Sequence, residues 1–65
     1  MNSEMAELIV SRIKVRKKPT ALFVTPFGFR LKSPSQMTQS DRCNLDYIGT
    51  YTTSVTVEQI SEDCA

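Results

Sequence analysis

The sequence contains no histidine and no tryptophan, and its only glycines are Gly28 and Gly49. Without histidine the chain cannot form a Ser-His-Asp triad or a Cys-His nucleophile pair. Two isolated glycines cannot make a glycine-rich phosphate loop. Asp41 and Asp46 are close in sequence, but paired catalytic carboxylates need an enclosing cleft that a chain of 65 residues rarely builds. The composition therefore argues against catalysis, and we expect a protein that is not an enzyme.

Cysteine and long apolar runs are also scarce. Cys43 and Cys64 are the only cysteines, and without histidine they cannot form a tetrahedral zinc site within one chain. The N-terminal region carries acidic residues and no long apolar core, so it does not resemble a secretory signal. The longest apolar runs, Leu8–Val10 and Ala21–Val24, are far shorter than the ~20 residues of a membrane helix. We therefore expect a cytoplasmic protein with free thiols, no metal or cofactor, and no membrane partner.

The length allows one small domain spanning residues 1–65. Such a chain buries only about 60% of the surface that its unfolded form exposes, so its stability margin is narrow. With disulfides and metal in short supply, association of two copies is the remaining source of burial, and we expect a homodimer.

Charge is distributed unevenly along the chain although the net charge is only +1. Residues 1–33 hold seven of the eight basic residues, whereas residues 34–65 hold five of the seven acidic ones. The basic residues of the first half are Arg12, Lys14, Arg16, Lys17, Lys18, Arg30 and Lys32. This polarity is the main indication of a binding surface.

Residues 8–16 alternate between apolar or small residues and basic ones. Ile9, Ser11, Ile13 and Val15 would take one side, and Arg12, Lys14 and Arg16 the other. This period of two, with β-branched residues, predicts a half-buried strand. A helix that buries Met5, Leu8, Ile9 and Ile13 is the alternative.

Residues 20–32 carry the strongest local signal, that of a β-hairpin. The apolar run Thr20–Thr25 and the segment Phe29–Lys32 flank Pro26 and Gly28, which favour a type I turn closed by a left-handed glycine. A three-residue loop of this kind pairs Thr25 with Phe29, Val24 with Arg30, and Phe23 with Leu31.

Three further elements are expected. Ser33 and Pro34 predict the start of a short helix reaching about Arg42, with a structured loop as the alternative. The segment Asp46–Thr56, rich in tyrosine and threonine, predicts a strand with a bulge or close backbone approach at Gly49. The Thr56–Gln59 pattern predicts either a last short helix or a frayed strand end. The expected fold is α+β and β-dominant, an antiparallel meander of three to five short strands with one or two short helices.

In this fold Arg12 and Lys14 would share a sheet face with Arg30 and Lys32, opposite Phe23 and Phe29. Such a face could follow a phosphate backbone, but a charged outer face is also what a two-sided sheet normally shows. A single-strand binder would place aromatic rings among these charges, and the expected register does not.

Phe27, at the tip of the hairpin, could anchor a partner protein or fold over to cap the core. The strand within Tyr47–Thr56 could pair with a second copy, and Glu58, Glu62 and Asp63 could screen the basic half. Our leading hypothesis is a small binding protein that modulates or inhibits another protein, as do many small domains carried by viruses and mobile elements. The alternative is nucleic-acid binding. The residues expected to contact the partner are Arg12, Lys14, Arg16, Lys17, Lys18, Phe27, Arg30 and Lys32.

Overall fold

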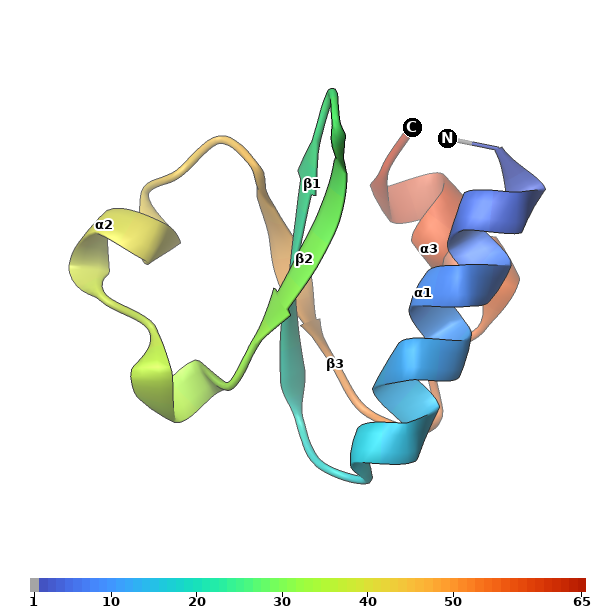
Figure 1. Ribbon diagram of the computed structural model, residues 1–65, viewed down its shortest axis with the longest axis horizontal. Coiled ribbons are helices and arrows are strands. Elements are labelled where there is room, and N and C mark those ends of the chain that lie inside the picture. Colours follow the sequence, from blue (N-terminus) through green and yellow to red (C-terminus); the bar gives the residue numbers. More distant parts are fainter. Residues whose placement is uncertain (1) are drawn as a thin grey trace.

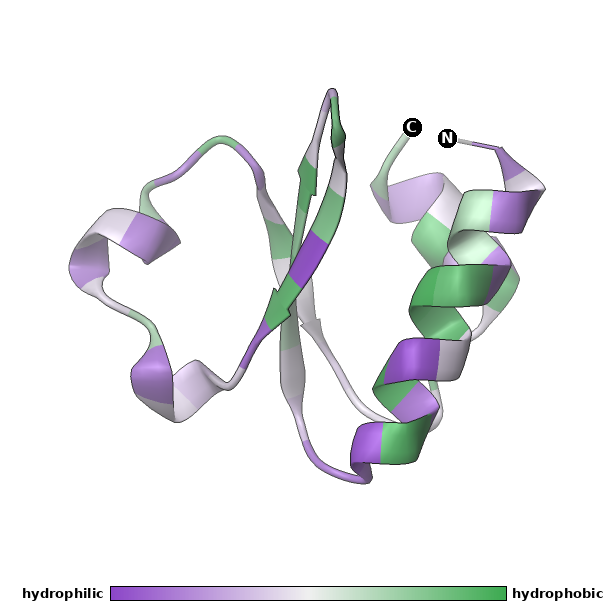
Figure 2. Ribbon diagram, viewed as in Figure 1, coloured by the Kyte–Doolittle hydropathy of each residue, from purple (hydrophilic) through white to green (hydrophobic). Residues whose placement is uncertain are grey.

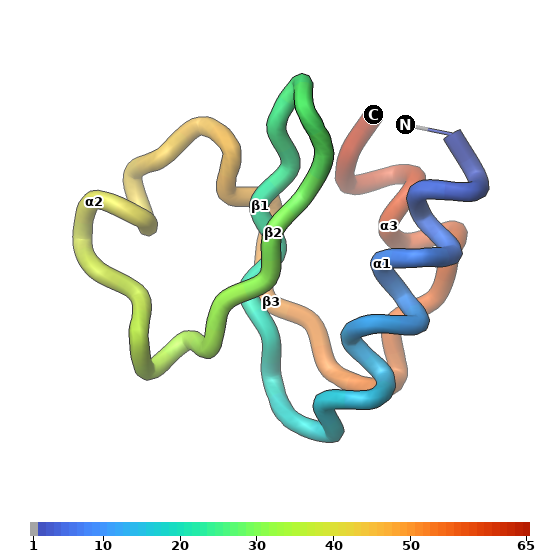
Figure 3. Tube along the Cα trace, in the orientation of Figure 1, coloured from blue at the N-terminus to red at the C-terminus, as the bar shows by residue number. Residues whose placement is uncertain are grey.

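The computed structural model describes residues 2–65 and shows one three-stranded antiparallel sheet with helices on both sides of it (Figure 1). The elements follow in the order α1 (Ser3–Arg16), β1 (Thr20–Thr25), β2 (Gly28–Lys32), the 3-10 turn η1 (Pro34–Gln36), α2 (Gln39–Arg42), β3 (Tyr47–Tyr51) and α3 (Val57–Asp63). Helices α1 and α3 lie against one face of the sheet. The segment of residues 33–46, which contains η1 and α2, projects on the other side (Figure 3). We call this segment the flap.

Helix α1 overturns the prediction of a strand at residues 8–16. Its buried residues Ala6, Ile9, Val10 and Ile13 follow the spacing of one helical face. Asn2 begins the helix by accepting a hydrogen bond from the Met5 amide, and Lys17 ends it in the left-handed conformation, with φ of 55°. The alternation of Ile9 and Ile13 with basic residues fits both periods, and the burial of the 14-residue helical face decides between them.

The hairpin of β1 and β2 is confirmed, but its predicted register is wrong by one residue. The loop contains only Pro26 and Phe27, and Gly28 with φ of 141° belongs to β2. The Thr25 hydroxyl accepts a hydrogen bond from the Phe27 amide, which stabilises the shorter turn. The pairs are Thr25 with Gly28, Val24 with Phe29, Phe23 with Arg30, Leu22 with Leu31 and Ala21 with Lys32.

This shift changes which side chains share a face, because successive strand residues point to opposite sides. Phe29 and Leu31 lie on the helix-covered face with Leu22 and Val24, where they pack against the core. Phe23 lies on the flap face instead, beside Arg30. The expected grouping of Phe23 with Phe29 is therefore wrong.

The flap holds two short turns in place of the single helix expected from Ser33 to Arg42. Pro34 occupies the first turn of η1 as predicted, but the Ser33 side chain makes no capping hydrogen bond. Helix α2 has its own capping box, in which Thr38 and Asp41 bond to each other's backbone amides. Figure 2 shows that the flap is mostly hydrophilic, whereas the apolar residues concentrate in the sheet and α1.

Strand β3 confirms a strand within Asp46–Thr56, although only Tyr47–Tyr51 is paired. It pairs with β1 on the side away from β2, so the strand order is β2-β1-β3 and the sheet is not a meander. A bulge interrupts the pairing opposite Leu22 and Phe23, next to Gly49. The bulge expected at this glycine is therefore present, whereas the contact at Gly49 is with a side chain and not with a neighbouring backbone: an added Cβ would lie 3.2 Å from the Tyr51 hydroxyl.

Helix α3 begins at the predicted cap, where Thr56 accepts a hydrogen bond from the Gln59 amide. Ile60 is fully buried against α1 and the sheet. The Tyr51 hydroxyl donates to the Asp63 carboxylate at 2.6 Å and thereby joins β3 to α3. Burial, followed by this bond to a carboxylate, raises the pKa of Tyr51 far above its ordinary value.

The fold is thus α+β with an antiparallel sheet, as predicted, but helix is more extensive than a β-dominant fold would have. Helix α1 alone has 14 residues, whereas the longest strand has 6. None of the helices in residues 2–65 combines the length and the apolar content required to cross a bilayer.

Candidate functional site

Helix α1 carries a second stripe of side chains beside its buried face. This stripe consists of Leu8, Arg12, Val15 and Arg16; Arg12 follows Leu8 by four residues, and Val15 and Arg16 follow Arg12 by three and four, so all lie along one flank of the helix. The Leu8 side chain is 46% exposed and Val15 is 74% exposed. An exposed apolar residue is ordinary in isolation, but here two of them flank two arginines.

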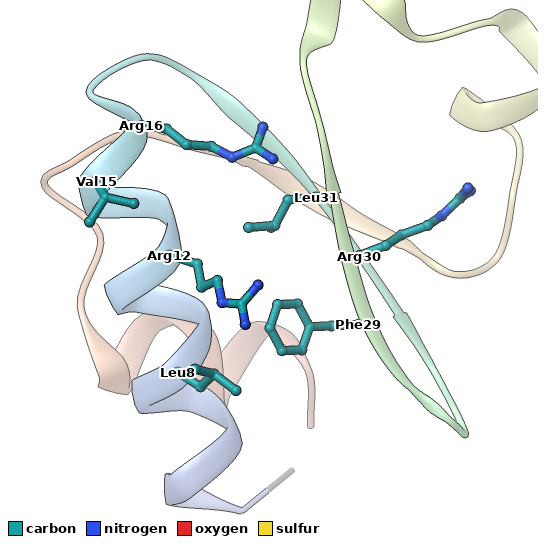
Figure 4. A pocket seen from close by; sticks show the side chains of 7 residues that line it. All are labelled: Leu8, Arg12, Val15, Arg16, Phe29, Arg30 and Leu31. Carbon is teal, nitrogen blue, oxygen red and sulfur yellow. The ribbon is translucent and has the colours of Figure 1, made fainter.

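Strand β2 faces this stripe across a groove. Phe29 and Leu31 are half-buried and point from β2 towards α1, whereas the Arg30 side chain points away from it (Figure 4). The resulting groove has a volume of about 480 Å³ and is open to solvent. Its lining residues are Leu8, Arg12, Val15, Arg16, Phe29, Arg30 and Leu31. We call it the α1–β2 groove.

The two arginines of the groove point inwards over its apolar wall. In Figure 4 the Arg12 guanidinium lies beside the Phe29 ring, and Arg16 extends towards Leu31. Within residues 2–65 both ion pairs of the protein are made by Asp41, so neither Arg12 nor Arg16 has a carboxylate partner. The groove therefore joins apolar surface to uncompensated positive charge.

On the opposite face of the sheet, the basic residues form ion pairs within the protein. Lys32 donates to Asp41 at 2.6 Å, and Arg30 lies 3.6 Å from the other oxygen of the same carboxylate. The hydrogen bond from Lys32, helped by the Thr38 amide, lowers the pKa of Asp41 to about 2. Asp41 thus ties the flap to β2.

Phe23 forms the base of this second face. It is fully buried, with its ring centroid 5.3 Å from that of Tyr47. The Arg30 guanidinium lies 4.4 Å from the centre of the Phe23 ring, in cation–π geometry. Arg30 thus makes contacts within the fold, while its side chain stays 53% exposed.

The single basic surface expected from the sequence is not formed. Arg12 and Arg16 lie in the α1–β2 groove, whereas Arg30 and Lys32 contact Asp41 beneath the flap. The other predicted basic residues, Lys14, Lys17 and Lys18, are exposed at and beyond the C-terminal end of α1 and do not line the groove. The physical reason is the helix, which spreads around its axis the side chains that a strand would align.

Phe27 lies at the tip of the hairpin, as predicted, and is 98% exposed. It does not cap the core, so that alternative is wrong. Leu45, in the loop that leads from α2 to β3, is equally exposed.

Four apolar residues of the groove were not among the predicted contact residues: Leu8, Val15, Phe29 and Leu31. Their signal in the sequence is the helical spacing of Leu8, Arg12, Val15 and Arg16. It becomes visible only once residues 3–16 are taken as a helix.

Within residues 2–65 no three side chains of the metal-ligating types lie together, and every buried side-chain polar atom has a hydrogen-bond partner. Cys43 and Cys64 are both free thiols. Comparison of the chain with protein-family models, with curated proteins and with solved structures gives no match.

Proposed function

We propose that this chain is a non-enzymatic binding protein that modulates a partner protein by holding a segment of it in the α1–β2 groove. The observation that carries the proposal is the combination of Arg12 and Arg16 with Leu8, Val15, Phe29 and Leu31 in one open groove. Arginine and aromatic side chains in concave, partly apolar sites are the usual anchors of protein interfaces.

The groove supports binding better than catalysis. None of its seven lining residues has a nucleophilic or carboxylate side chain. The energy available is that of covering apolar surface, about 25 cal/mol per Å², together with charge-assisted hydrogen bonds to two guanidinium groups. Both contributions stabilise a bound ligand without any chemical step.

The alternative is nucleic-acid binding. It is supported by the consecutive exposed residues Arg16, Lys17 and Lys18 at the end of α1, which a phosphate backbone could contact. It is weakened by the commitment of Arg30 and Lys32 to Asp41. A peptide ligand uses the apolar walls of the groove, which a phosphate backbone would leave uncovered.

Two other expectations belong to this proposal. A cytoplasmic site of action agrees with two free cysteines. Pairing of two copies along β3, an edge strand of the sheet, would supply additional burial, and light scattering at high concentration tests this homodimer.

Selection from a random peptide library displayed on phage tests the binding function. The bait is the full chain, and the comparison is a groove variant, Leu8→Glu with Val15→Glu, which alters two exposed positions and leaves the core intact. Lys14→Glu is the matched control, because it also places a glutamate on the exposed side of α1 but outside the groove. Circular dichroism checks that all three proteins are folded.

We expect enriched peptides that bind the wild-type chain and the Lys14→Glu control but bind the groove variant at least about tenfold more weakly, a loss of ~1.4 kcal/mol. Enrichment of nothing, or of peptides that bind the groove variant equally well, would overturn the proposal. Titration with duplex and single-stranded oligonucleotides at low and high salt tests the alternative. Binding that falls steeply with salt and is lost in a Lys17→Glu, Lys18→Glu variant would establish nucleic acid in place of protein.

A further inference from the structure

The α1–β2 groove runs along a strand edge that forms no ladder with any other part of the described chain. Strand β2 is the outer strand of the sheet and pairs only with β1 within residues 2–65. An edge strand directs half of its backbone N–H and C=O groups outwards, where they are available to another strand.

The register identifies which groups these are. The Val24 amide donates to the Asp46 carbonyl at 2.8 Å, so the backbone of Val24 points towards the β3 side and away from β2. Val24 faces Phe29, which makes this a pair without hydrogen bonds between β1 and β2. By the alternation of antiparallel pairs, Phe29 and Leu31 direct their N–H and C=O groups to the open edge.

The residues with outward backbone groups are also the residues whose side chains form the wall of the groove. A strand placed along β2 would therefore bond to Phe29 and Leu31 through its backbone and rest its inward side chains over the stripe on α1. A helix in the groove could not do this, because its own backbone groups are already paired.

The charges of the groove select the side chains of such a strand. Arg12 and Arg16 are four residues apart on α1, a rise of about 6 Å. Alternate residues of a strand are separated by about 6.7 Å. Two carboxylates at alternate positions of an added strand therefore match the spacing of the two guanidinium groups, while Leu8 and Phe29 offer an apolar contact for a neighbouring residue on the same side.

A second copy of this chain is a poor occupant of the groove. In an antiparallel pairing of β2 with itself centred on Arg30, the half-exposed Arg30 side chains of two copies would face each other, and like charges in facing positions destabilise a sheet. This pairing would also leave Arg12 and Arg16 without a counter-charge. A strand with acidic side chains avoids this repulsion and supplies counter-charges for Arg12 and Arg16.

From these observations we infer that the ligand of the α1–β2 groove is an extended segment of another protein that adds to β2 as a fourth strand. This segment carries an apolar residue and two carboxylates at alternate positions. The inference rests on the proposed binding function and specifies its mode.

A peptide titration followed by NMR tests the inference on the full chain. The probe is a blocked peptide of eight residues in which one valine and two glutamates occupy alternate positions, separated by threonines, prepared in both orders. Because Phe29 and Leu31 expose their amides in the free protein, their hydrogen exchange is expected to slow when the peptide binds. Exchange at Arg30, which already pairs with Phe23, is expected to change little.

Two matched sets of controls separate backbone pairing from charge. N-methylation of one alternate set of peptide amides is expected to abolish binding, whereas methylation of the other set, which faces solvent, preserves it. The variant Arg12→Glu with Arg16→Glu is expected to lose at least about tenfold in affinity for the glutamate peptide. This variant should instead bind a peptide with lysine in place of both glutamates. The variant Lys14→Glu with Lys18→Glu carries the same change of charge outside the groove and is expected to retain most of its affinity for the glutamate peptide.

Each outcome decides a different point. Slowed exchange at Phe29 and Leu31 together with the reversed charge preference supports the inference. Binding in the groove without protection of these amides, or equal binding of glutamate and lysine peptides, overturns strand addition and leaves the proposed function standing. Failure of both designed peptides overturns the inference, and the library selection then shows separately whether the groove binds peptides of another kind. Displacement of the peptide by an oligonucleotide that itself binds with steep salt dependence overturns it in favour of nucleic acid.

Discussion

One face of the sheet is covered by α1 and α3 and the other by the flap, and different forces hold the two covers. Under the helices the contacts are apolar, with Ile9, Ile13 and Ile60 fully buried. Beneath the flap the Asp41 carboxylate contacts both Lys32 and Arg30, and among residues 2–65 Phe23 is the only large apolar side chain that is fully buried on that side. The comparison shows how a chain of 65 residues closes both sides of its sheet with too few apolar residues for two cores.

The largest expected effect is the loss of stability caused by a substitution in the core beneath the helices. Ile13→Ala should lower the free energy of unfolding by about 2–5 kcal/mol, because it removes buried methyl groups and leaves a cavity. Met37→Ala, at a half-buried position of the flap, should cost no more than about 1 kcal/mol. Urea denaturation of both variants measures the difference. Equal losses would show that the flap is as much a core as the helices are.

The second effect concerns the contact between Gly49 and Tyr51. A methyl group at Gly49 would meet the Tyr51 hydroxyl at 3.2 Å, and the bond to Asp63 prevents that ring from moving aside. Gly49→Ala should therefore cost about 1–3 kcal/mol, the usual range for overpacking. Tyr51→Phe removes the hydroxyl oxygen, the nearest atom of the contact. The double variant should therefore lose less free energy of unfolding than the sum of the losses in the two single variants. Additive costs in denaturation experiments would contradict this explanation.

The third prediction uses pH to distinguish the stability of the flap side of the sheet from that of the helix-covered side. The pKa of Asp41 is about 2 in the folded chain, below its ordinary value of 3.8, so the charged form stabilises the fold. This contribution is complete above the unfolded value and is lost as the pH falls from about 4 towards 2. NMR signals of the flap should therefore change over this range before those of the helix-covered core, and Asp41→Asn should remove the early change. Simultaneous loss of both sides in the wild-type chain would contradict the assignment to Asp41.

The smallest expected effect concerns the C-terminal end of helix α1. Lys17 ends α1 with φ of 55°, a conformation that glycine adopts more easily than lysine. Lys17→Gly should leave stability unchanged or raise it by up to ~1 kcal/mol, whereas Lys17→Ala should not raise it. Thermal denaturation of the two variants gives the comparison. A clear loss with glycine would mean that the lysine side chain itself stabilises the helix end.

Several elements could be predicted because their signals are local. The place of the hairpin turn at Pro26, the Thr56 cap of α3 and a strand within the tyrosine- and threonine-rich segment 46–56 each depend on residues adjacent in sequence. For residues 8–16 the sequence predicts the helix only as the alternative to a strand, since Ile9 and Ile13 satisfy a period of two as well as a helical one. Within that window only the burial of Val10 beside Ile9 and Ile13 distinguishes a helix, and the N-cap Asn2 and the buried Ala6 precede the window.

The candidate site depended on the two features that local patterns determine least well. A turn through Pro26 and Gly28 can close with two or three residues, and the choice moves Phe23 and Phe29 to different faces. The choice of helix over strand then separates Arg12 from Arg30. Arg12 and Arg16 were among the predicted contact residues, but their apolar neighbours in the groove come from an arrangement that only the three-dimensional fold creates.

The extreme exposure of Phe27 and Leu45 has a practical consequence. Both side chains are 98% exposed, and neither lines the α1–β2 groove. Substitutions at these two positions should therefore combine additively with substitutions in the groove. A substitution at Phe27 or Leu45 thus serves as a control that alters an exposed apolar residue outside the groove.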